Sequence, residues 1–348
     1  MSNSSSYISD SLKAAPFQLN IWFGSFLWVT GNIGCLGNII VFRSRSFRER
    51  AYSIYLVSEA LSDCLYFNFV LLTRVLQKGF QISLTTRYDS ICKLRQFVSV
   101  WGNQISFTLF TFATIDRILS AQRDNKYRRW SNRVSVAYKA TILCLLFWFL
   151  LICHRLVLYK TVDGSCIRPT GFYDDYDNYF EVVFTAIMPP VAMYLLAYLL
   201  IRSVRGVIQR RITPGNNQPQ QTNIKHRTVL QQMDIQLTKM LILQCAVAVL
   251  TYVPFAAELI YSNVTQYWTK TPYQRALEKI VVELTHLLSY VFFATSFYVS
   301  IVTNVGFRRE MLRFIPCSTN LRRSETRCST LQHAAGSTFT SPYEKTKY

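Results

Sequence analysis

The chain has 348 residues, of which 50% are hydrophobic and only 16% are charged, and its formal net charge is +19. Soluble domains carry about 25% charged residues and disordered chains are far poorer in apolar ones, so both classes are excluded. Nucleic-acid-binding proteins can be this basic, but they are rarely so poor in charged residues overall. The composition therefore indicates an integral membrane protein whose basic residues gather in loops, with no nucleic-acid partner.

Seven segments are long and apolar enough to cross a bilayer as helices, which takes roughly 20 mainly apolar residues. In chain order they are Ile21–Phe42, Tyr52–Leu76, Val98–Leu119, Val134–Tyr159, Phe180–Ile201, Met240–Tyr261 and Ile280–Val302. The second and third are the least apolar, because the second contains Glu59 and Asp63 and the third contains Asn103 and Gln104. Spans four to six carry charges only near their ends, which argues against soluble helices with a solvated face.

The basic residues orient these spans. If the amino terminus is outside, the inner loops and carboxyl tail carry 26 Lys and Arg against seven acids, and the outer segments carry 12 against ten. Lys and Arg gather on the cytoplasmic side of membrane proteins, so the amino terminus is predicted outside and the carboxyl terminus inside. The predicted parts are an extracellular tail, a seven-helix bundle, a short amphipathic helix and a cytoplasmic tail, over residues 1–20, 21–303, 304–316 and 317–348.

The predicted outer face carries two covalent features. Of the nine cysteines, only Cys92 and Cys166 are expected at this oxidising face, where disulfides form. A disulfide would join the top of span three to the second outer loop, and two free thiols are the alternative. Glycosylation sequons begin at Asn3 and Asn263, which fall on the same side.

Polar residues and prolines recur along the spans at characteristic positions. They are Gly37 and Asn38 in span one, Asp63 in span two, Asp116 and Arg117 at the inner end of span three, Trp148 in span four, Pro190 and Tyr198 in span five, and Pro254 in span six. Their order and spacing, with Cys92 lying 25 residues before Arg117, resemble the rhodopsin-like (class A) G-protein-coupled receptors. The chain resembles a divergent, peptide-receptor-like member, which implies an all-α bundle of seven transmembrane helices with a short eighth helix.

The resemblance implies an activation switch at the inner ends of spans three and six. In the family, the Arg matched by Arg117, beside Asp116, pairs with an acid on span six and holds the inactive state. Asp234 lies at the matching place, 20 residues before Pro254, and a solvated loop acid is the alternative. Pro254 removes a backbone hydrogen bond and kinks span six, so its inner half can swing outward and admit a G protein. Tyr198 belongs to the same switch.

A polar cluster at mid-membrane depth matches the place where the family builds a sodium site. It would combine Asp63 with oxygens of Asn38, Ser106 and Ser296, and oxygen ligands suit a hard cation. The alternative is a protonated Asp63 in a hydrogen-bonded core network. Glu59, one turn earlier, is unusual for the family and would share a proton with Asp63.

Spans six and seven depart from the family pattern. Tyr252 stands where the CWxP motif has Trp. The Asn, Pro and Tyr positions of the NPxxY motif hold Ser296, Phe297 and Ser300. These departures concern the activation relay and the sodium site, and they leave the predicted fold unchanged.

The resemblance also places a ligand cavity between the outer halves of the spans. Its expected lining is Asn103, Gln104, Tyr252, Phe255, Leu259, His286 and Tyr290. Tyr290 stands where an opsin has its retinal-binding Lys, and Ser99 stands where an amine receptor has its acid. Neither a retinal cofactor nor a monoamine ligand is therefore expected.

The second outer loop suggests the charge of the ligand. It interleaves tyrosines with four acids, Asp174, Asp175, Asp177 and Glu181. An acidic, aromatic rim attracts a cationic ligand such as a basic neuropeptide, and a merely solubilising loop is the alternative. Arg74 is expected to pair with a ligand carboxylate or with Glu283, or to extend outward to solvent.

The expected function is that of a plasma-membrane receptor that binds an extracellular peptide or small molecule and activates a heterotrimeric G protein. A chemosensory or lipid receptor of the same fold, or a transporter or channel, is the alternative, and the chain shows no internal repeat typical of transporters. It also lacks a catalytic or metal-ligand motif, so we expect no enzyme activity. In this interpretation kinases and arrestin are further partners, with kinase sites in the tail. Cys317 is a palmitoylation candidate, and the basic inner face would contact membrane lipids.

Overall fold

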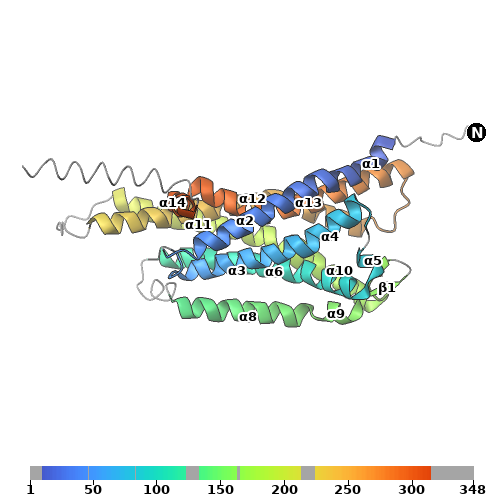
Figure 1. Cartoon of the computed structure of the whole chain (residues 1–348), viewed down its shortest axis with the longest axis horizontal. Helices are drawn as coiled ribbons and strands as arrows, with labels where there is room; N and C mark the ends of the chain where they lie inside the picture. The colour runs from blue at the N-terminus through green and yellow to red at the C-terminus, as the bar shows by residue number, and fades with distance from the viewer. Residues whose placement is uncertain are drawn as a thin grey trace, which may run out of the picture.

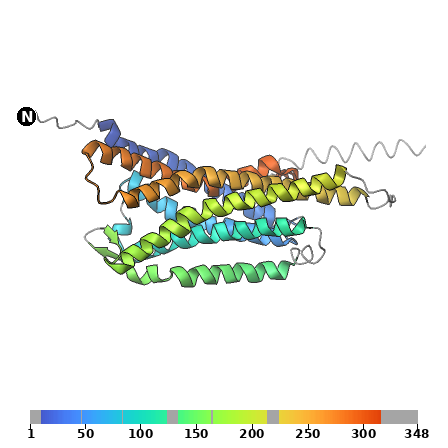
Figure 2. The same cartoon turned by 180° about the vertical axis from the view of Figure 1, so that it is seen from behind.

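The computed structural model describes residues 10–45, 47–82, 84–122, 133–162, 165–212 and 224–314, and for residues 206–212 and 224–234 it describes the backbone alone. Within these ranges, long helical segments run side by side along one axis (Figure 1). The short helix α14 (Val305–Phe314) lies at one end, and the hairpin of β1 (Lys160–Val162) and β2 (Ser165–Ile167) lies at the other. The view from behind shows α11 and α12 crossing the opposite side of the same bundle (Figure 2). This is the predicted seven-helix bundle.

The first four spans are each one helix or a series of helical pieces. They are α1 (Asp10–Leu19), η1 (Asn20–Gly24) and α2 (Ser25–Phe42); α3 (Ala51–Tyr66), η2 (Phe67–Leu71), α4 (Leu72–Arg74) and η3 (Val75–Gly79); α6 (Asp89–Ser120); and α8 (Val134–Ile152) with α9 (His154–Leu158). The η pieces are π-helical turns, in which each N–H donates to the carbonyl five residues earlier instead of four. They therefore shift the side chains that the outer half of each span presents to its neighbours.

The last three spans are longer than predicted. They are α10 (Phe172–Phe180), η4 (Glu181–Ile187) and α11 (Met188–Ile212); α12 (Ile224–Val264); and α13 (Pro272–Thr303). Thr271 caps α13, because its hydroxyl accepts the backbone N–H of Gln274 while the Gln274 side chain accepts the N–H of Thr271. This capping box starts the last span well outside the predicted apolar core.

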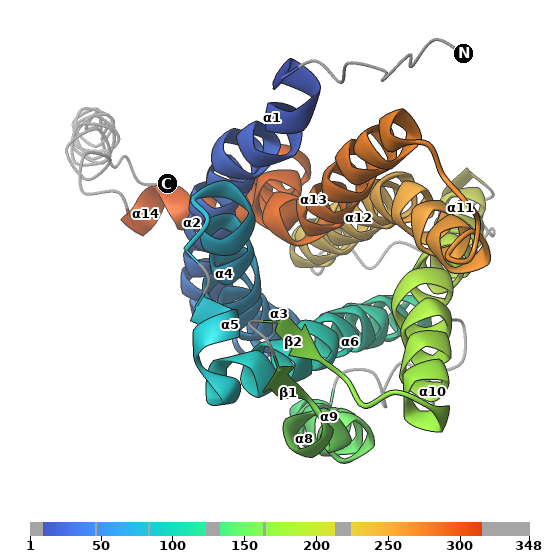
Figure 3. The same ribbon diagram turned by 90° about the vertical axis from the view of Figure 1, so that its right-hand side faces the viewer.

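Helix α6 is the central and least apolar span. Among the described residues, six helices are long and apolar enough to cross a membrane, and α6 is not one of them. It nevertheless has 32 residues, a length of about 48 Å at the usual rise per residue. Helix α6 packs against α3, α8 and α11 (Figure 3). Its polar residues Asn103, Gln104 and Ser106 are buried among these helices. Seen along the bundle, α8 lies outside the ring of the other helices.

The first helix begins at Asp10, so part of the predicted extracellular tail is helical. Helix α1 packs on the outer end of α13, and the Lys279 ammonium lies 5.4 Å from the centre of the Phe17 ring. The Asn20 side chain is fully buried there and donates a hydrogen bond to Glu283 at 3.1 Å. These contacts with α13 stabilise the first span beyond its predicted apolar part, which begins at Ile21.

The two ends of the bundle differ in structure. The outer end carries the short helix α5 (Leu84–Arg87) and a two-stranded antiparallel hairpin of β1 (Lys160–Val162) and β2 (Ser165–Ile167). The inner end carries α14 (Val305–Phe314), the predicted eighth helix. Asn304 starts α14 because its side-chain oxygen accepts the backbone N–H of Phe307 at 3.1 Å. Phe307 is fully buried against Phe42 and Phe297, which fixes α14 across the bundle end.

Candidate functional site

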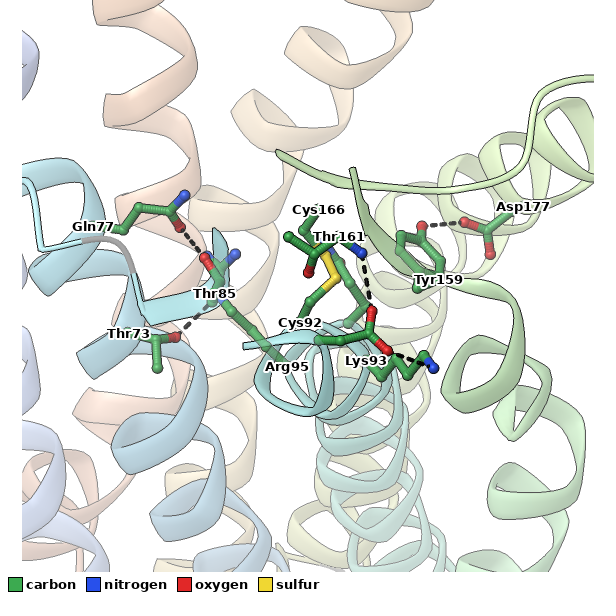
Figure 4. Close-up of a disulfide and its surroundings, with 12 residues drawn as sticks. Thr73, Gln77, Thr85, Cys92, Lys93, Arg95, Tyr159, Thr161, Cys166 and Asp177 are labelled. Carbon is green, nitrogen blue, oxygen red and sulfur yellow. Dashed lines mark hydrogen bonds and ion pairs between the residues drawn. A yellow bond between two sulfur atoms is a disulfide. The ribbon is translucent and has the colours of Figure 1, made fainter. Parts of the chain in front are cut away.

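A disulfide ties the outer hairpin to the central helix. Cys92, near the start of α6, is bonded to Cys166 in β2, and their Cα atoms are 5.7 Å apart (Figure 4). A second link lies beside it, because the Asp89 carboxylate accepts the backbone N–H of Thr161 at 2.9 Å. The hairpin is therefore held on top of α6 at two points.

The acids of the second outer loop are engaged in ion pairs within the protein. Asp177 is fully buried and accepts hydrogen bonds from Arg155 Nε at 2.8 Å and from the Tyr159 hydroxyl at 2.7 Å. Arg155, also buried, reaches Glu181 at 3.2 Å. Arg168 pairs with Asp174 and lies 3.4 Å from Asp177. The network clamps the end of span four onto the start of span five and neutralises much of the charge expected of an open acidic rim.

The pKa of Arg168 is shifted by this network. Its partial burial lowers the pKa of the guanidinium, but the hydrogen bond to Asp174 and the negative groups around it outweigh burial and raise the pKa above its ordinary value. Asp175 is the exposed exception among the four acids. A cationic ligand approaching this loop would therefore meet Asp175 more readily than its three neighbours.

The predicted ligand-lining residues come together on three helices. The Asn103 amide donates to the Tyr252 hydroxyl at 3.2 Å, and the Gln104 amide donates to the Phe184 carbonyl at 2.8 Å. Phe255 packs on the His286 ring with centroids 4.9 Å apart. Tyr290 packs on Tyr66 at 5.2 Å, and Leu259 is half-buried near the outer end of α12. All seven residues thus lie in the outer half of the bundle.

An aromatic cluster lies directly below these residues. Phe107 contacts Tyr252 edge-on at 4.8 Å and stacks on Phe292 at 4.7 Å. Phe292 in turn contacts Phe110 and Phe293. Aromatic pairs at these distances contribute about 0.5–1.5 kcal/mol beyond the area they bury. The cluster joins α6, α12 and α13 at mid-membrane depth.

Charged residues from several outer segments converge beside the lining residues. Arg74 Nη2 lies 2.6 Å from a Glu283 oxygen, and Lys78 lies 3.7 Å from the other oxygen. Arg74 therefore pairs with Glu283, one of the alternatives expected from the sequence. Arg95, one turn below Cys92, donates to the Thr73 hydroxyl at 3.0 Å (Figure 4).

The predicted sodium site has oxygens with unused hydrogen-bonding capacity. The Ser106 hydroxyl donates to Asp63 at 2.5 Å, and the Asn38 amide donates to Ser296 at 3.2 Å. The Asn38 side-chain oxygen and both Glu59 carboxylate oxygens are buried without a hydrogen-bond partner. Because unpaired buried oxygens are costly, this donor set fits a cation or a proton.

The predicted switch residues lie at the inner end of the bundle. Arg117 Nη2 is 2.5 Å from the neighbouring Asp116 carboxylate, and both side chains are buried. The Arg117 guanidinium also lies 4.4 Å from the centre of the Tyr52 ring. Pro254 lies within the continuous helix α12, and Tyr198 is 56% exposed on α11. Asp116 and Arg117 are thus brought together, whereas Tyr198 faces away from them.

Several predicted features fall outside the described residues or side chains. The Asp234 backbone lies in α12, but its side chain is outside the described part. Asn3 and Cys317 also lie outside it. Asn263 is described, in the last turn of α12, where its amide donates to the Leu259 carbonyl at 2.8 Å. Thr265 of the same sequon is buried. A glycan at Asn263 would therefore require this helix end to open.

Phe297, at the position where the family has proline, is accommodated by glycines of α2. A Cβ atom added at Gly37 would overlap the Phe297 ring, and one added at Gly34 would lie 3.3 Å from its Cβ. Ser300, at the position of the motif's tyrosine, is fully buried and donates to Met240 and to the Ser296 carbonyl. The divergent motif thus has its own complementary packing.

We expect Gly37→Ala to lower the thermal midpoint of the purified protein, with a cost of about 1–3 kcal/mol, typical of an overpacked core. The Phe297 ring cannot simply turn away, because it is packed against Phe307 and Tyr298. Adding Phe297→Leu should restore most of the loss by shrinking the opposing ring. A Gly37→Ala protein with the wild-type midpoint would contradict this account of the glycine.

Two features of the site were missed from the sequence, the position of Arg95 and the pair of Arg155 with Asp177. Arg95 lies on the same helix stripe as Cys92 and Ser99, because residues three and four apart share a face. That periodicity would have indicated an arginine facing the ligand cavity. The partnership of Arg155 with Asp177 had no such signal, since the two residues lie on different spans.

The comparison with known families agrees with this arrangement. A family model described as "7 transmembrane receptor (rhodopsin family)" matches residues 31–295. The match covers most of the chain and runs from α2 to α13. Among curated proteins, none matches the chain significantly.

Proposed function

Because the chain belongs to the rhodopsin family of seven-transmembrane receptors, which are multi-pass proteins of the plasma membrane, we propose that it binds an extracellular ligand between the outer halves of its helices and activates a heterotrimeric G protein. The observation that carries the proposal is the buried pair of Asp116 and Arg117 at the inner end of α6. Burying an ion pair costs desolvation that the attraction of the two charges repays only in part, so we take its place at the inner end as a sign of a functional role.

The inner end supports a switch of the following kind. Arg117 is held by Asp116 and by the ring of Tyr52. When the inner part of α12 moves outward, the cleft that opens beside α6 would let the G protein reach Arg117. We propose Asp234, on the same helix, as a further latch for Arg117. Kinases and arrestin would act on the tail that follows α14.

The proposal is tested by G-protein activation in cells that express the full chain with a promiscuous Gα subunit and receive pools of synthetic peptides. We expect Arg117→Ala to reduce the response to an active pool to background, because the G-protein contact is lost. Asp234→Ala should instead raise the signal without peptide. Arg133→Ala, which removes an exposed basic residue of the same inner face, is the matched control and should respond like wild type. Full activity of Arg117→Ala at equal surface expression would refute the proposed coupling.

We propose a peptide as the ligand class. Asp175 and the exposed rings of Tyr176 and Tyr179 offer charge and aromatic contact at the loop. The other acids of the loop are paired within the protein, so the loop supports a strongly basic peptide less than its composition suggests. A response to lipids or small odorants, with none to any peptide pool, would favour a lipid or chemosensory receptor.

We also propose that a sodium ion stabilises the resting receptor. Asp63, Ser106 and Asn38 would hold it, and Glu59 would add a second carboxylate that the ordinary family site lacks. A hard cation there would neutralise the buried charge. The proposal predicts a higher thermal midpoint in sodium than in choline at equal ionic strength, and no difference in an Asp63→Asn protein.

A further inference from the structure

Three basic side chains gather around a single carboxylate at the outer end of the bundle. Arg74 and Lys78, from α4 and η3, both contact Glu283 of α13, at 2.6 and 3.7 Å. Arg95 of α6 joins them from the side, and its only polar partner among the described residues is the Thr73 hydroxyl. Arg74 and Lys78 thus share the negative charge of Glu283, and Arg95 adds a third positive charge beside them through its contact with Thr73, next to Arg74.

The excess positive charge is partly withdrawn from solvent. Arg74 is only 9% exposed, and its Nε atom is buried without a hydrogen-bond partner. Arg95 is half-buried by its neighbours. A buried guanidinium without a full set of acceptors is costly, because it loses its water and gains too little in return. The cluster therefore has unused capacity to bind an anion.

The cluster acts on the residues that line the proposed ligand cavity. The charges of Arg74, Lys78 and Arg95 all act on His286. Arg95 also lies within electrostatic reach of Tyr66, Tyr290 and Glu283. The positive groups thus stand beside an aromatic surface rather than on an open loop.

The other described acids at the outer ends of spans three, six and seven are not paired with this cluster. Asp89 pairs with Lys93 at 2.7 Å, and Glu278 pairs with Lys270 at 2.8 Å. Glu258 of α12 accepts a hydrogen bond from Ser262 at 2.6 Å with one oxygen, and its other oxygen is buried without a hydrogen-bond partner. None of these pairs includes Arg95, whose partner is Thr73, so the protein itself does not complete the cluster.

Resting on the receptor function proposed above, we propose that Arg95, with Arg74 and Lys78, binds a carboxylate group of the ligand, while the apolar part of the ligand packs on Tyr66, Tyr290 and His286. The planar guanidinium offers paired N–H donors that match two carboxylate oxygens. Such a carboxylate is the free carboxyl terminus of a peptide or the head of a fatty acid, and the experiment separates these two sources.

The test measures binding to the purified full chain in detergent by its thermal midpoint. The probes are a tetrapeptide library with free carboxyl termini, the same library amidated, and decanoate with decanol as its uncharged match. Each acid is compared with its match: free-acid peptides with amidated peptides, and decanoate with decanol. We expect the acid of one pair to raise the midpoint and its match to leave the midpoint unchanged. Arg95→Gln should weaken that binding by roughly 10-fold to 100-fold, the effect of losing a charged hydrogen bond.

Two further variants make the result decisive. Arg87→Gln removes an exposed arginine of the same outer end and should bind like wild type. Arg95→Lys keeps the charge without the paired donors and should fall between wild type and Arg95→Gln. Equal midpoint shifts from acids and their uncharged matches, no shift from any acid, or wild-type binding by Arg95→Gln would each overturn the inference.

The cellular assay separates this inference from the proposed function. If acids bind through Arg95 but no G protein responds, the carboxylate site stands and the coupling fails. If amidated peptides activate the receptor as well as the free acids do, the coupling stands and the carboxylate site is refuted.

Discussion

Replacing Asp177 by Asn is expected to lower the free energy of unfolding by about 3–5 kcal/mol, the usual cost of removing one partner from a buried ion pair. Asp177 is completely buried, and its two oxygens accept hydrogen bonds from Arg155 and Tyr159 at 2.8 and 2.7 Å. The amide keeps the shape of the side chain but removes its charge. Arg155 would then stay buried with Glu181 as its remaining acidic partner, at 3.2 Å.

The measurement is the thermal midpoint of the purified receptor, which should fall by roughly 10 °C for a loss of this size. Asp175→Asn is the matched control, because Asp175 lies two residues earlier in the same helix and is exposed. It should change the midpoint by no more than about 1 °C, since exposed charges contribute little. Equal midpoints for the two variants would show that the network does not clamp spans four and five.

Replacing Cys166 by Ser is expected to cost about 2–5 kcal/mol, because the disulfide closes a loop with a sequence separation of 74 residues. Without it, the hairpin keeps its packing on α5 and α6 and the surface hydrogen bond of Thr161 to Asp89, but no covalent link to α6. The outer loop would then leave α6 more often, and the ligand-lining ends of spans three and five would lose their common support.

Surface expression and thermal midpoint should both fall in the Cys166→Ser protein, and reductant should lower the midpoint of wild type to a similar value. Cys153→Ser is the matched control, since Cys153 is a partly buried cysteine outside the disulfide. Its midpoint should stay near that of wild type. A wild-type protein insensitive to reductant would contradict a structural role for the bond.

The number and orientation of the spans were predictable because they depend on local properties. Apolar length marks a span wherever its partners lie, and the basic residues of the inner loops set its direction. The third span was the weakest by hydropathy, and it proved to be the central helix α6. A central helix is surrounded by other helices, so it can carry polar residues that lipid would not tolerate. These polar residues lower its mean hydropathy.

Other features that depend on distant partners were not predictable. The stretch from Asp10 to Asn20 was assigned to the extracellular tail, whereas it is helical and packs on α13. Asp177 resembled its exposed neighbours in the sequence, yet it is buried because span five brings it against Arg155. The replacement of proline by Phe297 was visible in the sequence. Only the structure shows that the glycines of α2 make room for the Phe297 side chain.

The Phe107 cluster has a consequence for how ligands of this receptor would differ from one another. Tyr252 contacts the outer residue Asn103 by a hydrogen bond and the buried ring of Phe107 by packing. Packed rings are nearly incompressible, so a ligand that displaces Tyr252 would also displace Phe107 and the rings packed on it. We therefore expect affinity and efficacy to separate: the charge of a ligand sets how tightly it is held, and its bulk beside Tyr252 sets how strongly it signals. Small ligands of the right charge would then act as competitive antagonists.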